Sequence, residues 1–357
     1  MLPSSLAFNL STATVLVTGG CGFIGSEIVR QLMNNHPGCR VVNLDSLEYA
    51  GNPENVASVA SSPRYRFIQG DIRDASVVES ALAGVDAIIH TAAQTHVDRS
   101  ITGPTVFWDT NVMGTQSLVE AARKLGIQKF IHVSTDEVYG SLSTGHATED
   151  TPLNPTSPYA ASKAASDLLM QSAMKTYGFP ACITRCSNNY GPYQYPEKLI
   201  PLFIFKALRD ETLPLYGDGL HERDWIHVSD HAAGILKVLE AGNTGEIYNL
   251  GATNPTTNKD LIEHILEMLG KPASLITPVA DRPAHDRRYA IDSTKSRSQL
   301  GWKATIPFEQ GLADTLAWYQ SNPQWLESVR KRAEALNHSL EQGLHIKSPV
   351  SVSAGGR

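Results

Sequence analysis

The segment Thr18-Gly19-Gly20-Cys21-Gly22-Phe23-Ile24-Gly25 constrains the fold of this chain more than any other feature. It has the spacing G-x-x-G-x-x-G, follows an apolar, β-branched run at residues 13–18, and begins a stretch with helical spacing of apolar residues at 23–34. Glycines in such a turn let the backbone approach a pyrophosphate, and the N–H groups of a helix N-terminus attract phosphates. A purely structural glycine turn is the alternative, but the position between strand and helix predicts dinucleotide binding.

Acidic residues follow the next two predicted strands. Asp45, with Ser46 after it, ends the run at residues 40–45, about twenty residues beyond the glycine turn. A carboxylate there accepts hydrogen bonds from the adenosine ribose, which favours NAD over NADP. Asp71 and Ile72 follow the run at 65–69 and are predicted to contact the adenine, although a turn aspartate in solvent would show the same pattern.

Predicted strands alternate with predicted helices through the first half of the chain. Strands are expected at residues 13–18, 40–45, 65–69, 87–91, 129–134 and 181–185, and the helices between them include 23–34 and 110–125. This alternation implies right-handed crossovers and a parallel sheet covered on both faces. We therefore predict an α/β protein with a Rossmann-type doubly wound parallel sheet.

The sequence changes character after Gly191, where prolines mark irregular chain before helical patterns at 202–209, 225–239, 256–269 and 308–321. We expect an NAD-binding domain at residues 12–190, with a sheet completed by later segments. A smaller mixed α/β C-terminal lobe at 191–330 would bind the substrate, and residues 331–357 are expected to form a C-terminal tail.

Residues with acid–base chemistry cluster in two places. Thr135, Asp136 and Glu137 follow the predicted strand at 129–134, at the edge where open α/β sheets bind ligands. Tyr159 and Lys163 have the spacing Tyr-x-x-x-Lys, which puts both on one helix face and predicts that the ammonium lowers the phenol pKa. Alcohol oxidation needs one base, so two further carboxyls indicate elimination of water, unless they are solvated loop acids.

Composition excludes several classes of function. The chain has 357 residues and a net charge of −6, which gives no support for nucleic-acid binding. Its start lacks the pattern of a signal peptide and its apolar stretches are too short to cross a membrane, so we expect a cytoplasmic protein. Four cysteines lack metal-binding spacing, which predicts reduced thiols and no metal site.

Several longer motifs identify the chain as similar to a known family. They are residues 92–101 (Ala-Ala-Gln-Thr-His-Val-Asp-Arg-Ser-Ile), 134–140 (Ser-Thr-Asp-Glu-Val-Tyr-Gly), 187–192 (Ser-Asn-Asn-Tyr-Gly-Pro), 197–201 (Glu-Lys-Leu-Ile-Pro), 223–225 (Arg-Asp-Trp) and 281–289 (Asp-Arg-Pro-Ala-His-Asp-Arg-Arg-Tyr). Together with the glycine turn and Tyr-x-x-x-Lys, they resemble the nucleoside-diphosphate-sugar dehydratase branch of the extended short-chain dehydrogenase/reductases. Within that branch the resemblance is best to enzymes acting on dTDP-glucose.

The resemblance implies a hydro-lyase that converts a nucleoside-diphosphate-glucose to its 4-keto-6-deoxy sugar. Tyr159 would take the proton of the hydroxyl on sugar carbon 4 while that carbon gives hydride to NAD, and Thr135 would hydrogen-bond the same hydroxyl. Glu137 would then remove the hydrogen on carbon 5, and Asp136 would protonate the departing hydroxyl on carbon 6. The hydride returns to carbon 6. Asp136 must hold its proton near neutral pH, so we predict a raised pKa.

The resemblance also implies two sets of binding residues. The NAD set comprises Gly19, Gly22, Phe23, Ile24, Gly25, Asp45, Ser46, Asp71, Ile72, Ala92, Ala93, Thr110, Tyr159, Lys163 and Asn189. The substrate set comprises Thr95, Thr135, Asn188, Lys198, Leu199, Tyr216, Arg223, Asn258, His285 and Arg288. Lys198, Arg223 and Arg288 could neutralise a pyrophosphate in an acidic chain, although each could also be an ordinary surface cation.

Departures from the family pattern leave the nucleotide base open. Gln94 and Thr95 stand where glutamate and serine are expected, a variant shared with dehydratases of UDP-glucose, and Ala284 stands where glycine is expected. A UDP-glucose 4,6-dehydratase, a sibling epimerase or decarboxylase, a dehydratase of UDP-N-acetylglucosamine and a non-catalytic NAD-binding protein are the alternatives. The resemblance further implies a homodimer formed through the helices at 110–125 and 159–177.

Overall fold

A computed structural model of the chain describes residues 8–341 and contains a seven-stranded sheet at its centre. The strand order is β10-β6-β5-β4-β1-β2-β3, and all neighbouring pairs are parallel. The strands span β1 Thr14–Thr18, β2 Arg40–Asp45, β3 Tyr65–Gln69, β4 Ala87–His90, β5 Lys129–Thr135, β6 Ala181–Cys186 and β10 Ile247–Leu250. The predicted Rossmann-type parallel sheet is confirmed.

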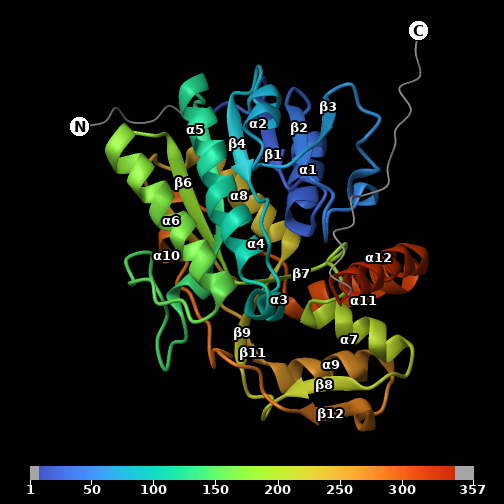
Figure 1. The fold of residues 1–357 in the computed structure, drawn as a ribbon. Helices are drawn as coiled ribbons and strands as arrows, with labels where there is room; N and C mark the ends of the chain where they lie inside the picture. The colour runs from blue at the N-terminus through green and yellow to red at the C-terminus, as the bar shows by residue number, and fades with distance from the viewer. Residues whose placement is uncertain (1–7, 342–357) are drawn as a thin grey trace.

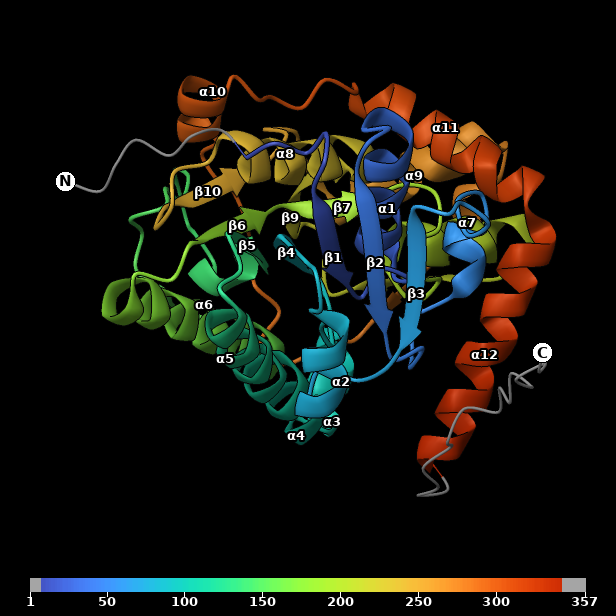
Figure 2. The ribbon, with the colours of Figure 1, turned by 90° about the horizontal axis from the view of Figure 1, so that it is seen from above.

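Helices cover both faces of this sheet, as the view from above shows (Figure 2). Helices α1 and α8 pack together on one face, and α2, α5 and α6 lie on the other. The helices of this part span α1 Phe23–Asn35, α2 Ala75–Ala81, α3 Val97–Thr102, α4 Thr105–Phe107, α5 Thr115–Leu125, α6 Pro158–Tyr177, α8 Val228–Ala241 and α10 Thr294–Leu300. Short helical turns span η1 Pro53–Val56, η2 Trp108–Gly114 (a π-helix) and η3 Asp136–Tyr139.

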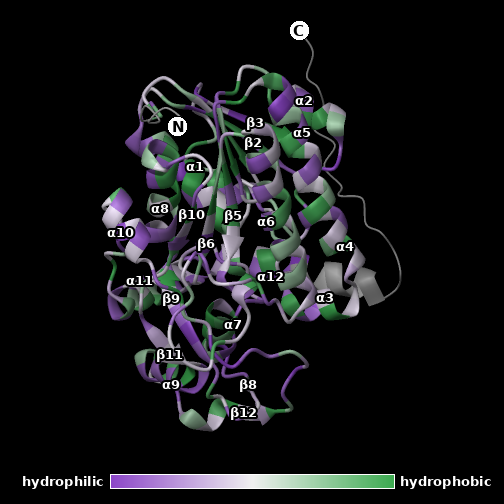
Figure 3. Ribbon diagram, turned by 90° about the vertical axis from the view of Figure 1, so that its left-hand side faces the viewer, coloured by the Kyte–Doolittle hydropathy of each residue, from purple (hydrophilic) through white to green (hydrophobic). Residues whose placement is uncertain are grey.

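Apolar side chains on the two faces of the sheet explain this layering. The inner strands are almost continuously buried, as expected for a parallel sheet covered on both sides, and hydrophobic segments appear both in the central strands and on the helices around them (Figure 3). One core joins α1 and α8 to the sheet through residues such as Ile28 and Ile235. A second joins α2, α5 and α6 through residues such as Leu118 and Met170.

A smaller lobe lies below the carboxyl ends of the strands (Figure 1). It contains a three-stranded sheet in the order β11-β9-β7, a two-stranded parallel sheet of β12 and β8, and its own apolar core. Its elements span β7 Asn188–Tyr190, β8 Leu213–Tyr216, β9 Glu222–His227, β11 Pro255–Thr257, β12 Ile276–Val279, α7 Leu199–Leu208, α9 Asn258–Leu269, η4 Ala273–Leu275, α11 Phe308–Ser321 and α12 Pro323–Glu341.

Several element boundaries differ from the sequence-based expectations. The helix expected at 225–239 begins only at Val228, because the residues before it pair in β9. The helix expected at 110–125 starts as the π-helix η2. Part of the expected tail is helical: α12 continues to Glu341, and Trp325, Leu326 and Val329 are buried in the core of the small lobe. Residues 342–357 of that tail lie outside the described residues.

Candidate active site

A cavity lies at the carboxyl ends of the central strands and extends from the glycine turn to the start of α7. The predicted residues that line it are Gly19, Gly22, Phe23, Ile24, Gly25, Asp45, Ser46, Asp71, Ile72, Ala92, Ala93, Thr95, Thr110, Thr135, Asp136, Glu137, Tyr159, Lys163, Asn188, Asn189 and Lys198. The structure thus brings together the whole predicted NAD set, all five predicted catalytic residues and part of the substrate set.

The glycine turn has no room for side chains at two of its positions. Gly19 has a φ of +70°, and a Cβ atom there would lie 2.8 Å from the backbone of Ala92. A Cβ on Gly25 would meet the carbonyl oxygen of Gly19 at 2.2 Å. Gly22 caps α1 without a side-chain hydrogen bond, so the first N–H groups of the helix face the cavity side of the turn without a capping side chain. This turn matches a phosphate-binding loop in shape and in chemistry.

Asp45 connects the glycine turn to the loop after β2. Its carboxylate accepts hydrogen bonds from Cys21 N at 2.9 Å and from Leu47 N at 2.8 Å. Burial raises the pKa of Asp45, and these two backbone bonds partly offset the effect. Asp71, at the adjacent strand end, forms an ion pair with Arg73, which lowers its pKa although partial burial acts in the opposite direction.

The loop after β4 is held by a residue that sequence reasoning missed. Asn111, buried in η2, accepts a hydrogen bond from Gln94 N at 2.8 Å and donates to Gln94 O at 3.0 Å. It also donates to the hydroxyl of Ser162 on α6 at 2.9 Å. One amide therefore fixes the loop at 92–95 relative to the helix of Tyr159.

The adjacent carboxyls have different surroundings. Asp136 is 3% exposed, and the hydroxyl of Thr135 donates to its Oδ1 at 3.3 Å. Burial raises the pKa of Asp136 well above its ordinary value, and the charges of Glu137 and Asp224 raise it further. Burial also raises the pKa of Glu137, but the cations Lys198, Arg223 and Arg282 lower it. The predicted upward shift of the Asp136 pKa is confirmed in direction.

Tyr159 lies one helical turn before Lys163 in the first turns of α6, and both side chains are buried. Burial raises the pKa of Tyr159 well above its ordinary value, and the charges of Glu137, Cys186 and Asp136 add to this effect. The net pKa of the phenol is therefore raised where a fall was expected, while the effect of Lys163 itself stays a prediction. Burial and two nearby carboxyls set this upward direction, and the Lys163 ammonium donates to Val133 O at 2.8 Å.

Two cations of the predicted substrate set lie near the carboxyls. Lys198 Nζ donates to Thr95 O at 2.8 Å. Arg223 is 5% exposed, stacks over the ring of Tyr289 at 4.3 Å, and donates to Asp286 O at 2.8 Å. Arg223 does not line the cavity, but its charge lowers the pKa of Asp136 and Glu137 alike.

The remaining predicted substrate residues lie outside the lining of the cavity: Leu199, Tyr216, Arg223, Asn258, His285 and Arg288. Arg288 is an ion-pair partner of Glu222 at 2.7 Å and also contacts Gly145 O, so its guanidinium is already engaged within the protein. Asn258 is buried at the start of α9. Ala284, expected as glycine, has a φ of +52°, which is the backbone conformation that favours glycine.

Lining residues that sequence reasoning did not assign to the site come mainly from the loops after β2 and β6. They include Glu48, Tyr49, Ala50, Gly51, Gln94, Cys186, Ser187, Gln194 and Tyr195. The hydroxyls of Ser187 and Tyr195 and the Oε1 of Gln194 are buried and have no hydrogen-bond partner within the protein. Because buried polar atoms normally have partners, these atoms indicate a polar ligand.

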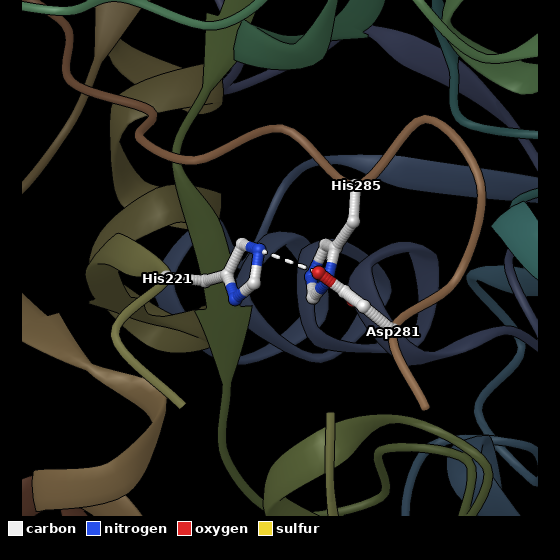
Figure 4. Close-up of side chains that lie close together, drawn as sticks. All are labelled: His221, Asp281 and His285. Atoms are coloured by element: carbon white, nitrogen blue, oxygen red, sulfur yellow. Dashed lines mark hydrogen bonds and ion pairs between the residues drawn. The ribbon is translucent and has the colours of Figure 1, made fainter. Parts of the chain in front are cut away.

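Three side chains of the small lobe that do not line the cavity lie together (Figure 4). The rings of His221 and His285 are stacked 3.6 Å apart at 13°. Asp281 lies 2.6 Å from His285 Nδ1 and 3.4 Å from His221 Nε2. A metal ion must lie near the plane of each imidazole that binds it, and two nearly parallel planes do not share such a point. The geometry fits a hydrogen-bonded stack better than a metal centre.

A family model described as GDP-mannose 4,6 dehydratase matches residues 16–315. The chain belongs to this dehydratase family. A dTDP-glucose 4,6-dehydratase from Streptomyces niveus is 47% identical over 333 residues, which cover 92% of this chain and 99% of that protein. The predicted membership in the nucleoside-diphosphate-sugar dehydratases is confirmed.

Solved structures place this dehydratase in the same fold as its relatives. The dTDP-glucose 4,6-dehydratase DesIV from Streptomyces venezuelae, solved with NAD bound, has a TM-score of 0.87 and 52% identity, and the match covers 88% of this chain and 99% of that chain. A UDP-glucose 4-epimerase from Thermus thermophilus, in complex with NAD, has a TM-score of 0.80 and 31% identity over 87% of this chain and 99% of that chain. The fold is thus shared across different activities, and the site must distinguish them.

Proposed function

We propose that this member of the family is an NAD-dependent hydro-lyase that converts dTDP-glucose to its 4-keto-6-deoxy product. The relatives at about half identity carry that activity in their names. The observation that carries the proposal is the pair Asp136 and Glu137 in one cavity with Tyr159 and Lys163. Oxidation alone would need only the tyrosine and the lysine, whereas elimination needs an additional acid and base.

The residues of the cavity fit NAD. The glycine turn and the N-terminus of α1 would hold the pyrophosphate, and Asp45 would accept from the adenosine ribose. Ser46, Asp71, Ile72, Ala92, Ala93, Thr110 and Asn189 would line the rest of the cofactor site. NAD, when bound, supplies a hydride acceptor for carbon 4 and later a hydride donor for carbon 6. Related structures that contain NAD support this assignment.

The proton steps follow from the side chains. Tyr159 would take the proton of the carbon 4 hydroxyl, with Thr135 hydrogen-bonded to the same group and Lys163 holding the ribose. Once carbon 4 is a ketone, the hydrogen on carbon 5 becomes acidic, and Glu137 would remove it as a proton. Asp136 would donate its proton to the hydroxyl that leaves carbon 6 as water. A raised pKa keeps Asp136 protonated for this purpose.

The electrostatic difference between the two carboxyls supports these roles. Asp136 is the more buried of the two, and the nearby Asp224 adds a second negative charge. Glu137 has Lys198, Arg223 and Arg282 around it, and these cations favour the carboxylate form that a base needs. Two acids in one site with surroundings that differ in this way suit one general acid and one general base.

The sugar nucleotide is proposed to lie between the cavity and the small lobe. Thr95, Asn188 and Lys198 would contact it from the cavity lining, and Arg223, with its buried guanidinium, would contribute positive charge. Substrate contacts are still proposed for four residues that do not line the cavity: Leu199, Tyr216, Asn258 and His285. Arg288 would have to break its ion pair with Glu222 to bind phosphate.

The test mixes purified protein with dTDP-, UDP-, GDP- and CDP-glucose separately and measures formation of a 4-keto-6-deoxy sugar. We expect product from dTDP-glucose at the highest kcat/KM. Faster turnover of UDP-glucose would favour the second candidate, a UDP-glucose 4,6-dehydratase, which Gln94 and Thr95 also permit. Formation of a 4-epimer without loss of water would assign the chain to the epimerases, and no product from any of the four would overturn the dehydratase proposal.

We further propose a homodimer formed through α5 and α6. Large apolar side chains are exposed on this side of the molecule, at Ile101, Val106, Trp108, Met113, Leu125, Leu168 and Tyr177. Such a surface favours association. The mass in solution of the parent protein and of a Met113→Lys/Leu168→Lys variant tests this. We expect the parent to be a dimer and the variant to be a monomer, and a monomeric parent would overturn the proposal.

A cytoplasmic location is proposed as well. All four cysteines are free thiols, as expected in a reducing compartment. None of the helices among residues 8–341 is long and apolar enough to cross a membrane. Fractionation of cells that express a tagged full-length chain tests the location.

A further inference from the structure

A buried ion pair lies behind Lys163. Asp167 follows Lys163 by one helical turn on α6, and Arg185 Nε donates to its Oδ2 at 2.8 Å. His132 Nε2 of β5 lies 3.4 Å from its Oδ1, and all three side chains are at most 1% exposed. Replacing such a pair by apolar residues is often neutral or stabilising, so its presence beside a predicted catalytic lysine calls for a functional reason.

Further contacts fix Arg185 in place. Its Nη1 donates to Tyr139 OH at 2.9 Å, and its guanidinium lies 4.8 Å from the centre of the Tyr139 ring. Tyr139 OH in turn donates to Asn249 Oδ1 of β10 at 2.8 Å. Asp167 is thereby tied to β6, η3 and β10, and its carboxylate has little freedom to move.

The titratable groups around Lys163 come from four elements: Tyr159 and Asp167 on α6, His90 on β4, His132 on β5 and Cys186 on β6. Burial lowers the pKa of His90 well below its usual range and that of His132 to about 4, so both are neutral near pH 7. Burial raises the pKa of Tyr159 and of Cys186, so neither carries a negative charge in the resting site, and the phenolate that takes the substrate proton in the proposed reaction has to form beside the Lys163 ammonium.

Asp167 differs from the other four groups because its carboxyl is charged near neutral pH. Burial acts to raise its pKa, but the nearby His132 ring and the charge of Arg185 outweigh burial, and its pKa is lowered. Near neutral pH it therefore supplies the negative charge of this group. Burial lowers the pKa of Lys163 to about 8, and the charge of Asp167 is the largest effect that opposes this.

We propose that Asp167 is a positioning residue for Lys163: its carboxylate, held by Arg185, keeps the buried ammonium one helical turn away in its charged form at the cavity. Lys163 Nζ donates to Val133 O, so a strand carbonyl anchors the side chain, and Asp167 acts on the ammonium through its charge from one helical turn away. The inference rests on the proposed function, in which a charged Lys163 holds the nicotinamide ribose.

The test measures two properties across pH: kcat with dTDP-glucose, and the fraction of NAD that the purified protein retains after gel filtration. In Asp167→Asn, the alkaline fall of both quantities should move to lower pH by about one unit or more, since an opposite charge at close range shifts a pKa by roughly one to three units. Asp230→Asn is the matched control, because Asp230 is also buried and hydrogen-bonded but serves the Thr305–Ile306 backbone.

A second variant covers the risk that Asp167→Asn leaves Arg185 unpaired and does not fold. Asp167→Asn/Arg185→Met removes both charges, and the alkaline fall should still lie at lower pH than in the parent. A fall at the parent pH in either folded variant would overturn the proposal, and failure of both variants to fold would count against it by showing that the pair serves stability. If the parent makes no product, the NAD measurement still tests this inference, and only the proposed function fails.

Discussion

The ammonium of Lys198 donates a 2.8 Å hydrogen bond to the backbone carbonyl of Thr95, so a cation from the small lobe is fixed beside the loop after β4. Of the cations near Glu137, Lys198 does most to lower the raised pKa of that carboxyl. The bond therefore joins the two lobes at the point where the proposed base is held in its charged form.

Lys198→Met should move the acidic limb of the kcat profile to higher pH. Removing a nearby positive charge raises the pKa of Glu137, so the base stays protonated to higher pH, by about one unit. Lys198→Arg keeps the positive charge, so its acidic limb should lie at the same pH as that of the parent. Lys237→Met, which changes an exposed lysine, is the control. An acidic limb at the same pH in the parent and in Lys198→Met would contradict the assigned base.

Asp136→Asn should stabilise the protein at neutral pH while it lowers activity. The folded-state pKa of Asp136 is raised, so in the window between the unfolded and folded pKa values the folded state holds a proton that the unfolded state has lost. Its contribution to stability therefore falls as pH rises through that window, by roughly 1.4 kcal/mol for each pH unit that the window spans. Asparagine does not titrate, so it removes this loss of stability. The rate should drop about 10²-fold or more because the general acid is gone.

Urea unfolding at acidic and neutral pH measures this difference. The parent should lose more stability between the two pH values than Asp136→Asn. Asp150→Asn, at an exposed position, should behave like the parent. An equal loss of stability in parent and Asp136→Asn would contradict the raised pKa.

Glu137→Gln should separate oxidation from elimination. Tyr159 and Lys163 remain, so carbon 4 can still be oxidised, but the proton on carbon 5 has no base. We expect reduced cofactor to accumulate, seen by its absorbance, while product formation falls about 10²-fold or more. Tyr159→Phe is the matched comparison, in which neither reduced cofactor nor product should appear. Wild-type turnover by Glu137→Gln would remove Glu137 from the mechanism.

Gly19→Ala should weaken NAD binding by a local clash. The new Cβ would lie 2.8 Å from the backbone of Ala92 at a φ of +70°. Gly84→Ala is a matched control, since Gly84 has a φ of +73° but nothing within 4 Å of the new Cβ. Both variants should lose about 1 kcal/mol of unfolding free energy to backbone strain, and Gly19→Ala should lose more. NAD retention should fall in Gly19→Ala alone. Equal retention in the two variants would contradict the role of the glycine turn in NAD binding.

The glycine turn, Asp45 and the alternation of strands and helices were readable from the sequence because they depend on neighbours a few residues apart. Backbone freedom at Gly19 and the burial of β1 follow directly from local residue types and their spacing. The same locality explains why Tyr159 and Lys163 could be placed on one helix face. The predicted residues at the carboxyl ends of the strands met in one cavity because parallel strands share that edge.

Electrostatic states and long-range partners required the tertiary structure. The pKa of Tyr159 rises where a fall was expected, since its burial and the carboxyls around it depend on packing. Lys198 and Thr95 are 103 residues apart in the chain, and Arg185 and Asp167 are 18 apart, on different elements. Sequence alone determined which chemical groups this protein possesses and the sheet edge that presents them, because short-range spacing sets secondary structure. Only the packed fold decided which groups carry charge, because desolvation and distance act between residues that the chain order keeps apart.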